Sequence, residues 1–183
     1  MDNGACSYRR FLNGDEAAFD EIMEELFFNL VFFLNRYVKD LPAAEDLAVD
    51  VFSELIARPH RYNFKVSLKT YLFTLGRSRA LDLLRHQKVL EFTDLSEAGD
   101  LPDGELSLEE RVLTKELQRT VHHALGQLPD EMQIAVHLVY FENMSYDETA
   151  KVMKKSRKQV DNLLYRAKKE LRALLGEEGK ELL

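Results

Sequence analysis

The chain has 183 residues, of which 45% are hydrophobic and 31% charged, and its formal net charge is −7. This balance is typical of a globular protein with one or two domains and argues against uniform coating of nucleic acid. The longest apolar run, Leu30 to Leu34, is too short to span a bilayer, the start does not resemble a signal peptide, and the single cysteine, Cys6, excludes an internal disulfide. We therefore expect a cytoplasmic protein.

The charge is distributed unevenly along the chain. Residues 1–50 carry eleven acids and four bases, residues 61–88 carry seven bases and one acid, and residues 90–110 carry eight acids and no base. A second basic stretch, Lys151 to Arg172, carries nine bases and two acids. Two cationic segments separated by acidic ones indicate two contacts with nucleic acid and at least one partner that is itself basic.

The first half of the chain predicts three helices. Residues 1–14 are expected to form a flexible lead. Apolar residues at steps of three and four then predict helices over about 15–39, 43–58 and 67–86, with breaks at Pro42 and Pro59. The second helix should present an acidic face, and Gly76 inside the third suggests a close approach to another helix, because glycine is unfavourable in a helix interior.

The loop before the third predicted helix mixes cations and aromatic rings. It runs through residues 59–66 and includes Arg61, Tyr62, Phe64 and Lys65. Unpaired bases stack on aromatic rings while lysine and arginine hold the backbone, so this loop and helix suggest a surface for single-stranded nucleic acid. Core packing is the alternative for each aromatic residue, and we expect Tyr62 and Phe64 to be the most exposed of them.

The second half predicts an acidic linker and a further helical unit. Residues 89–110, with Gly99, Pro102 and Gly104, are typical of a linker. Helices are expected over 109–125 and about 128–141. A capping box, Ser145 with Glu148, then opens a short helix, and Ser156 caps a last, basic helix that follows a tight turn.

The last helix is amphipathic. Its apolar side carries Val160, Leu163, Leu164 and Ala167, and its other side carries cations and an amide. A solvated surface helix would show the same pattern. The capped partner helix and the short turn favour a helix-turn-helix that enters a major groove.

These parts, in this order, resemble an RNA polymerase sigma factor of the two-domain, extracytoplasmic-function group. The segment Ala44 to Phe52 is similar to the polymerase-binding segment of sigma domain two. The segment Leu68 to Arg85 is similar to its promoter-melting helix, and Leu128 to Leu175 is similar to sigma domain four. The resemblance implies an all-α fold of two small helical domains: a lead at 1–14, domain two at 15–88, the acidic linker at 89–110, domain four at 111–176 and a tail at 177–183.

The resemblance also implies three sets of contact residues. The acidic helix would bind core RNA polymerase through Glu45, Asp46, Val49, Asp50 and Glu54. The unpaired non-template strand of the minus-ten element would contact Arg61, Tyr62, Asn63, Phe64, Lys65, Lys69, Tyr71, Arg77, Ser78 and Arg85. The minus-thirty-five element, as duplex, would contact Ser156, Arg157, Lys158, Gln159, Asn162, Tyr165, Arg166 and Lys169. Where family members usually have glycine in the turn, this chain has Lys154, which we expect in a left-handed conformation.

The implied function is transcription initiation, with core RNA polymerase, promoter DNA and an anti-sigma factor as partners and no small-molecule substrate. A stand-alone helix-turn-helix regulator with a sensing or dimerising front half is the alternative, but it leaves the basic aromatic segment at 61–88 unexplained. We do not expect an enzyme. The chain has no Gly-rich phosphate loop, and its five histidines lack ligand-like spacing, so neither a metal nor a cofactor is predicted.

Overall fold

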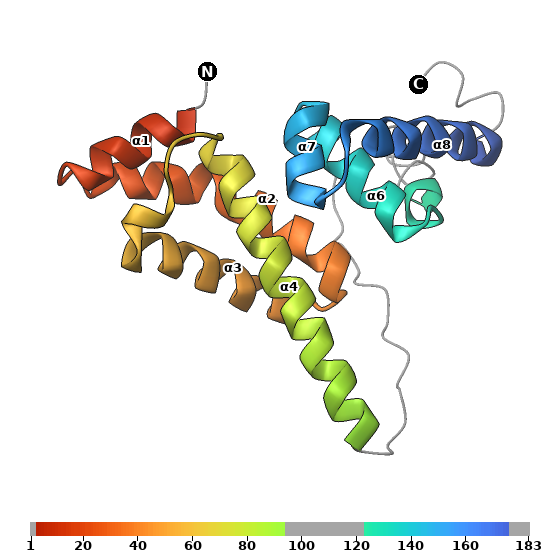
Figure 1. The fold of residues 1–183 in the computed structure, drawn as a ribbon, viewed down its shortest axis with the longest axis horizontal. Coiled ribbons are helices and arrows are strands. Elements are labelled where there is room, and N and C mark those ends of the chain that lie inside the picture. Colours follow the sequence, from red (N-terminus) through yellow and green to blue (C-terminus); the bar gives the residue numbers. More distant parts are fainter. Residues whose placement is uncertain (1–2, 94–122, 176–183) are drawn as a thin grey trace, which may run out of the picture.

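The computed structural model describes residues 3–93 and 123–175. Within these ranges the fold is all-helical (Figure 1). Helices α1 (Asn3–Leu12), α2 (Ala17–Val38), α3 (Leu41–Ala57) and α4 (Leu68–Thr93), with the short 3-10 turn η1 (Pro59–Arg61), form the N-terminal bundle. Helices α6 (Asp130–Val136), α7 (Tyr146–Met153) and α8 (Arg157–Leu175), with the π-helical turn η2 (His137–Phe141), form the C-terminal bundle.

Helix α1 lies where the sequence predicted a flexible lead, and that prediction is wrong. The Tyr8 side chain is fully buried, and its hydroxyl donates a hydrogen bond to the carbonyl oxygen of Leu55 at 2.9 Å. Burial raises the pKa of Tyr8 to about 12. Phe11 packs against Phe19 of α2 with ring centroids 5.0 Å apart. The aromatic side of α1 therefore forms part of the core of the N-terminal bundle.

The close packing of α4 on α2 depends on Gly76. A Cβ atom at this position would lie 3.1 Å from methyl carbons of Leu30 and Leu34, both fully buried on α2. That spacing is tighter than ordinary van der Waals contact. The close approach that the sequence suggested at Gly76 is confirmed.

The helix boundaries follow local signals. Lys39 is left-handed (φ 54°) and ends α2, and the Asp40 side chain accepts a hydrogen bond from the backbone amide of Ala43 at 3.4 Å to begin α3. The predicted helices 15–39 and 43–58 match α2 and α3 to within two residues. Helix α4 continues to Thr93, so residues 89–93 are helical where the sequence predicted linker. The rest of the predicted linker, most of the predicted helix 109–125 and the tail lie outside the described residues.

The C-terminal bundle contains a helix-turn-helix, formed by α7 and α8. Both halves of the predicted capping box are present, since the Ser145 hydroxyl accepts the Glu148 amide and the Glu148 carboxylate accepts the Ser145 amide. Lys154 adopts the expected left-handed conformation (φ 52°, ψ 46°) at the turn. The predicted single helix 128–141 is an α-helix followed by the π-helical turn η2.

The two bundles pack against each other. Helix α4 lies against α7, and α2 lies against α6 (Figure 1). Helix α8 lies on the opposite side of the C-terminal bundle from this contact, and the last turns of α4 extend beyond both bundles. The arrangement leaves α8 open and covers the first turn of α4.

Candidate nucleic-acid and polymerase interfaces

Helix α8 begins with a second capping box. The Ser156 hydroxyl accepts a hydrogen bond from the Gln159 amide at 3.2 Å, and the Gln159 side-chain oxygen accepts one from the Ser156 amide at 2.7 Å. These bonds satisfy two amides that a helix start leaves free. Of the residues expected at the minus-thirty-five element, Ser156 and Gln159 therefore also have a local structural role.

The two faces of α8 are cleanly separated. Val160, Leu163, Leu164, Ala167 and Leu171 are buried against the rest of the bundle. All eight residues expected at the minus-thirty-five element are exposed: Ser156, Arg157, Lys158, Gln159, Asn162, Tyr165, Arg166 and Lys169. Tyr165 has 72% of its surface exposed. The helix thus presents cations, an amide and a phenol on one surface, the donor types that bind phosphates and base edges.

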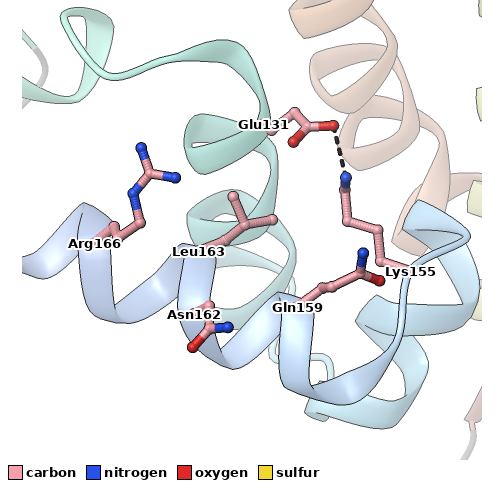
Figure 2. Close-up of a pocket in the computed structure, with 6 residues that line it drawn as sticks. All are labelled: Glu131, Lys155, Gln159, Asn162, Leu163 and Arg166. Atoms are coloured by element: carbon pink, nitrogen blue, oxygen red, sulfur yellow. Dashed lines mark ion pairs between the residues drawn. The ribbon is translucent and has the colours of Figure 1, made fainter.

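A shallow hollow lies between α8 and α6 beside this face. It is lined by Glu131, Lys155, Gln159, Asn162, Leu163 and Arg166 (Figure 2). Lys155 and Glu131 form an ion pair of 2.7 Å across the end of the hollow, so Lys155 already has an acidic partner. Within the described part of the C-terminal bundle, none of the eight expected contact residues forms an ion pair as short as that of Lys155. The shortest joins Arg157 to Asp147 at 3.4 Å.

On α3, four of the five expected polymerase contacts face outward. Glu45, Asp46, Val49 and Asp50 are exposed, and Val49 has 52% of its surface open. Glu54 differs, because its side chain is only 6% exposed. The structure therefore places four of these residues on one accessible, mainly acidic surface and turns the fifth inward.

Glu54 lies beneath a group of arginines. Its carboxylate forms ion pairs with Arg61 of η1 and Arg79 of α4, and lies 3.7 Å from Arg58. These partners, with Arg79 first, hold the pKa of Glu54 below its usual range although burial acts in the opposite direction. The three guanidinium groups are about half exposed, so one buried carboxylate organises a cationic edge. The sequence placed Glu54 at the polymerase and did not select Arg79; only the positions of α4 and η1 reveal the group.

The expectation that Tyr62 is exposed is wrong. It is 3% exposed, and its ring packs between those of Phe64 and Tyr71, with centroids 4.6 Å and 5.1 Å away. Its hydroxyl donates to the carbonyl oxygen of Val66 at 2.8 Å. Phe64 is half-buried, with the Arg9 guanidinium 4.7 Å from its ring centre. The ring of Tyr62 therefore supports the loop from inside, and bases cannot stack on it in this arrangement.

The remaining minus-ten candidates divide into two groups. Exposed members are Arg61, Asn63, Lys65 and Arg85, and half-buried members are Lys69, Tyr71, Arg77 and Ser78. The Asn63 side-chain oxygen accepts the Lys65 amide at 3.1 Å and so shapes the loop. Lys69 is the most restricted cation, because its ammonium group lies 2.6 Å from the Glu142 carboxylate in the C-terminal bundle.

Among the residues that the structure describes, no three histidine, cysteine or acidic side chains converge in a way that could hold a metal ion. No helix in the described ranges is long and apolar enough to cross a membrane. The surfaces that stand out are the open face of α8, the cationic edge around Glu54 and the acidic face of α3.

Comparison with known proteins accounts for both bundles. The family model described as Sigma-70 region 2 matches residues 29–89, and the model described as Sigma-70, region 4 matches residues 118–171. RNA polymerase sigma factor YlaC of Bacillus subtilis is 25% identical over 154 residues, covering 84% of this chain and 89% of the relative. ECF RNA polymerase sigma factor SigX of the same organism is 28% identical over 161 residues, covering 86% and 83%.

Solved structures agree on the fold. The sigma factor RpoE from Bartonella quintana, solved in complex with the anti-sigma factor NepR, matches with a TM-score of 0.68 at 19% identity and covers 87% of this chain and 97% of its own. CnrH, solved in complex with the cytosolic domain of CnrY, matches with a TM-score of 0.60 at 21% identity and covers 94% of each chain.

The fold, the helix-turn-helix and these matches define the chain as an RNA polymerase sigma factor of the sigma-70 family. Regions 2 and 4 and relatives such as SigX place it in the extracytoplasmic-function group. The stand-alone regulator is not favoured, because it does not explain the region 2 match.

Proposed function

We propose that the chain directs core RNA polymerase to promoters by holding three surfaces in one molecule: the acidic face of α3, the cationic edge of α4 with its loop, and the open face of α8. The observation that carries this proposal is the face of α8, where every expected contact residue is exposed while the opposite side is buried. The chain would act in the cytoplasm by binding alone, without catalysing a reaction. Sigma domain two would span residues 15–88 and sigma domain four residues 111–176.

Helix α8 would lie in the major groove of the minus-thirty-five element. Arg166 and Asn162 are one turn apart on its exposed face, and both side chains can form paired hydrogen bonds with base edges. Arg157, Lys158 and Lys169 would hold phosphates, and Tyr165 would pack against the sugar-phosphate backbone. Ser156 and Gln159, which cap the helix, would place the first turn at the backbone.

The minus-ten element would bind along the loop and the outer side of α4. Arg61 and Arg79, held by Glu54, and the exposed Lys65 and Arg85 supply positive charge for an unpaired non-template strand. Opening the duplex costs a few kcal/mol for each unstacked base, and binding of the released strand offsets this cost. Phe64, half-buried at the rim of the loop, is the aromatic ring we assign to base contact in place of Tyr62.

Core polymerase would bind the exposed face of α3 through Glu45, Asp46, Val49 and Asp50. We leave Glu54 out of this surface, because its carboxylate is covered by arginines. RpoE was solved in complex with the anti-sigma factor NepR and CnrH in complex with the cytosolic domain of CnrY, and we propose that an anti-sigma factor also regulates this chain.

The experiment is reconstituted transcription. Purified chain and core RNA polymerase are mixed with a panel of promoter fragments, and promoter-directed transcripts are measured with core polymerase alone as the control. We expect transcripts from a subset of promoters, with strand opening near the minus-ten element. Specific binding of duplex DNA without any association with polymerase would contradict the proposal and favour a stand-alone regulator.

A further inference from the structure

The contact between the two bundles includes an ion pair between a half-buried ammonium group and a buried carboxylate. The Lys69 ammonium of α4 lies 2.6 Å from the Glu142 carboxylate and donates a hydrogen bond to the Glu142 backbone oxygen at 2.9 Å. Glu142, which follows η2, is 6% exposed, and the ring of His137, also 6% exposed, lies 3.3 Å from its other carboxylate oxygen. A buried carboxylate is costly without partners, and here its cationic partner comes from the other bundle.

A second carboxylate crosses the same contact. Oxygen Oε2 of Glu148 accepts hydrogen bonds from the backbone amide and the hydroxyl of Ser145 and so caps α7. Oxygen Oε1 accepts hydrogen bonds from the hydroxyls of Ser67, which precedes α4, and Thr70, in its first turn, at 3.1 Å and 3.2 Å. One side chain thus caps the helix-turn-helix and holds it to the N-terminal bundle.

The position of these acids matters for DNA binding. A helix start carries partial positive charge and attracts anions, and Lys69 adds a full charge there. Glu142 and Glu148 occupy the positions at which a nucleic-acid phosphate would meet Lys69, Ser67 and Thr70. At the edge of the contact, the ion pair of Lys39 with Asp130 contributes little, since it is more than 60% exposed on each side.

We propose that Glu142 and Glu148 latch the C-terminal bundle onto the first turn of α4, so that the free chain is held in a closed form in which its own carboxylates occupy a DNA-binding surface. The proposal rests on the proposed contact of Lys69 with the minus-ten strand. Binding of polymerase and DNA must then separate the bundles, and any ligand that binds only the separated form shifts the chain toward it.

Energy transfer between two dyes tests the latch. The chain has one cysteine, Cys6, which is exposed on α1, and Arg172→Cys adds a second exposed site on α8. We expect a dominant closed population in the otherwise unchanged labelled chain. Glu142→Gln, which keeps the shape and removes the charge, should raise the ratio of open to closed molecules roughly tenfold. Glu148→Ala should act in the same direction.

Two matched variants control for indirect effects. Ser145→Ala removes the other half of the α7 capping box and leaves Glu148, Ser67 and Thr70 themselves unchanged. Asp130→Asn removes the exposed ion pair at the edge of the same contact. Both should retain the closed population. If Ser145→Ala opens the chain as much as Glu148→Ala does, or if Glu142→Gln leaves the populations unchanged, the latch is disproved.

A further experiment tests the latch and the proposed contact of Lys69 with DNA independently. It uses a single strand with the minus-ten sequence of a promoter that the chain transcribes. Added to the labelled chain, it should favour the open form and bind the Glu142→Gln chain more tightly, because effects on binding and on opening are reciprocal. Tighter binding by Glu142→Gln supports the competition. Opening by Glu142→Gln with no change in strand binding would retain the latch and overturn the role of Lys69 at the minus-ten element.

Discussion

Helices α4 and α8 are both cationic, but the surroundings of their charged side chains differ. On α8, the base-contacting candidates face solvent, and the capping of the helix is completed by its own neighbours. On α4, Lys69 and Arg79 are tied to carboxylates from other helices, Glu142 and Glu54. A free cation can bind any phosphate that arrives, whereas a paired one must first lose or reorient its partner. The two helices therefore differ less in charge than in whether their cations can bind a phosphate without first leaving an acidic partner.

The largest effect is expected from Glu54→Ala, which removes the organising carboxylate of the N-terminal bundle. Loss of one member of a buried ion pair costs about 3–5 kcal/mol. Solvent at the half-exposed arginines should reduce this to about 2 kcal/mol in the free energy of unfolding. Circular dichroism in denaturant measures it, since the chain has no tryptophan. Asp50→Ala, an exposed acid one turn earlier on α3, is the control, and equal stability of both variants would contradict the role of Glu54.

Next in size is Arg166→Ala on α8. We expect the holoenzyme to bind the minus-thirty-five duplex roughly tenfold more weakly. The slope of log affinity against log salt concentration should decrease by about the contribution of one phosphate contact. Arg172→Ala removes an exposed arginine near the end of the same helix and should have little effect. Equal binding by both variants would mean that the open face of α8 is not the DNA surface.

A charge reversal on α3 should have a smaller effect, which is limited to the association of the chain with core polymerase. Asp50→Lys is expected to weaken association with core polymerase several-fold and to leave the thermal stability of the chain near that of the unchanged protein, because the side chain is exposed. Asp20→Lys on α2 makes the same change of charge at another exposed position. Normal association by Asp50→Lys would place the polymerase contact elsewhere on the chain.

The smallest effect concerns pH and His137. Burial, with contributions from Arg36 and Lys69, lowers the pKa of His137, and Glu142 only partly opposes this. The unfolded chain therefore binds a proton that the folded chain does not, so stability should fall as pH drops below the usual histidine pKa of about 6.5. Glu142, whose pKa its partners lower despite burial, loses its contribution only at more acid pH. His137→Asn should flatten the stability curve between pH 7 and 5.5, and an unchanged curve would exclude His137 as its cause.

The sequence predicted the long amphipathic helices well, because their apolar period of three to four residues reflects burial on one side. Helices α2, α3 and α8 follow from such local signals, and so do the capping box of Ser145 with Glu148 and the cap at Ser156. Helix α1 was missed because nothing local shows that its Tyr8 side chain is buried, with the hydroxyl bonded to the carbonyl oxygen of Leu55, 47 positions away in the sequence.

The errors at the site have the same origin. Tyr62 lies in a polar loop, and nothing local reveals that Phe64 and Tyr71 enclose it. Glu54 follows Asp46 and Asp50 at four-residue spacing, so its pairing with Arg79 of another helix has no sequence signature. The contacts of Glu148 with Ser67 and Thr70 join residues about eighty positions apart and were equally invisible.

The two oxygens of Glu148 also determine which hydrogen bonds are lost and which are kept if the bundles separate. Oε1 can release Ser67 and Thr70 to water while Oε2 stays with Ser145, so the capping box that begins α7 can remain intact. We therefore expect the helix-turn-helix to separate as a preformed unit and to reach the duplex without refolding of its first helix.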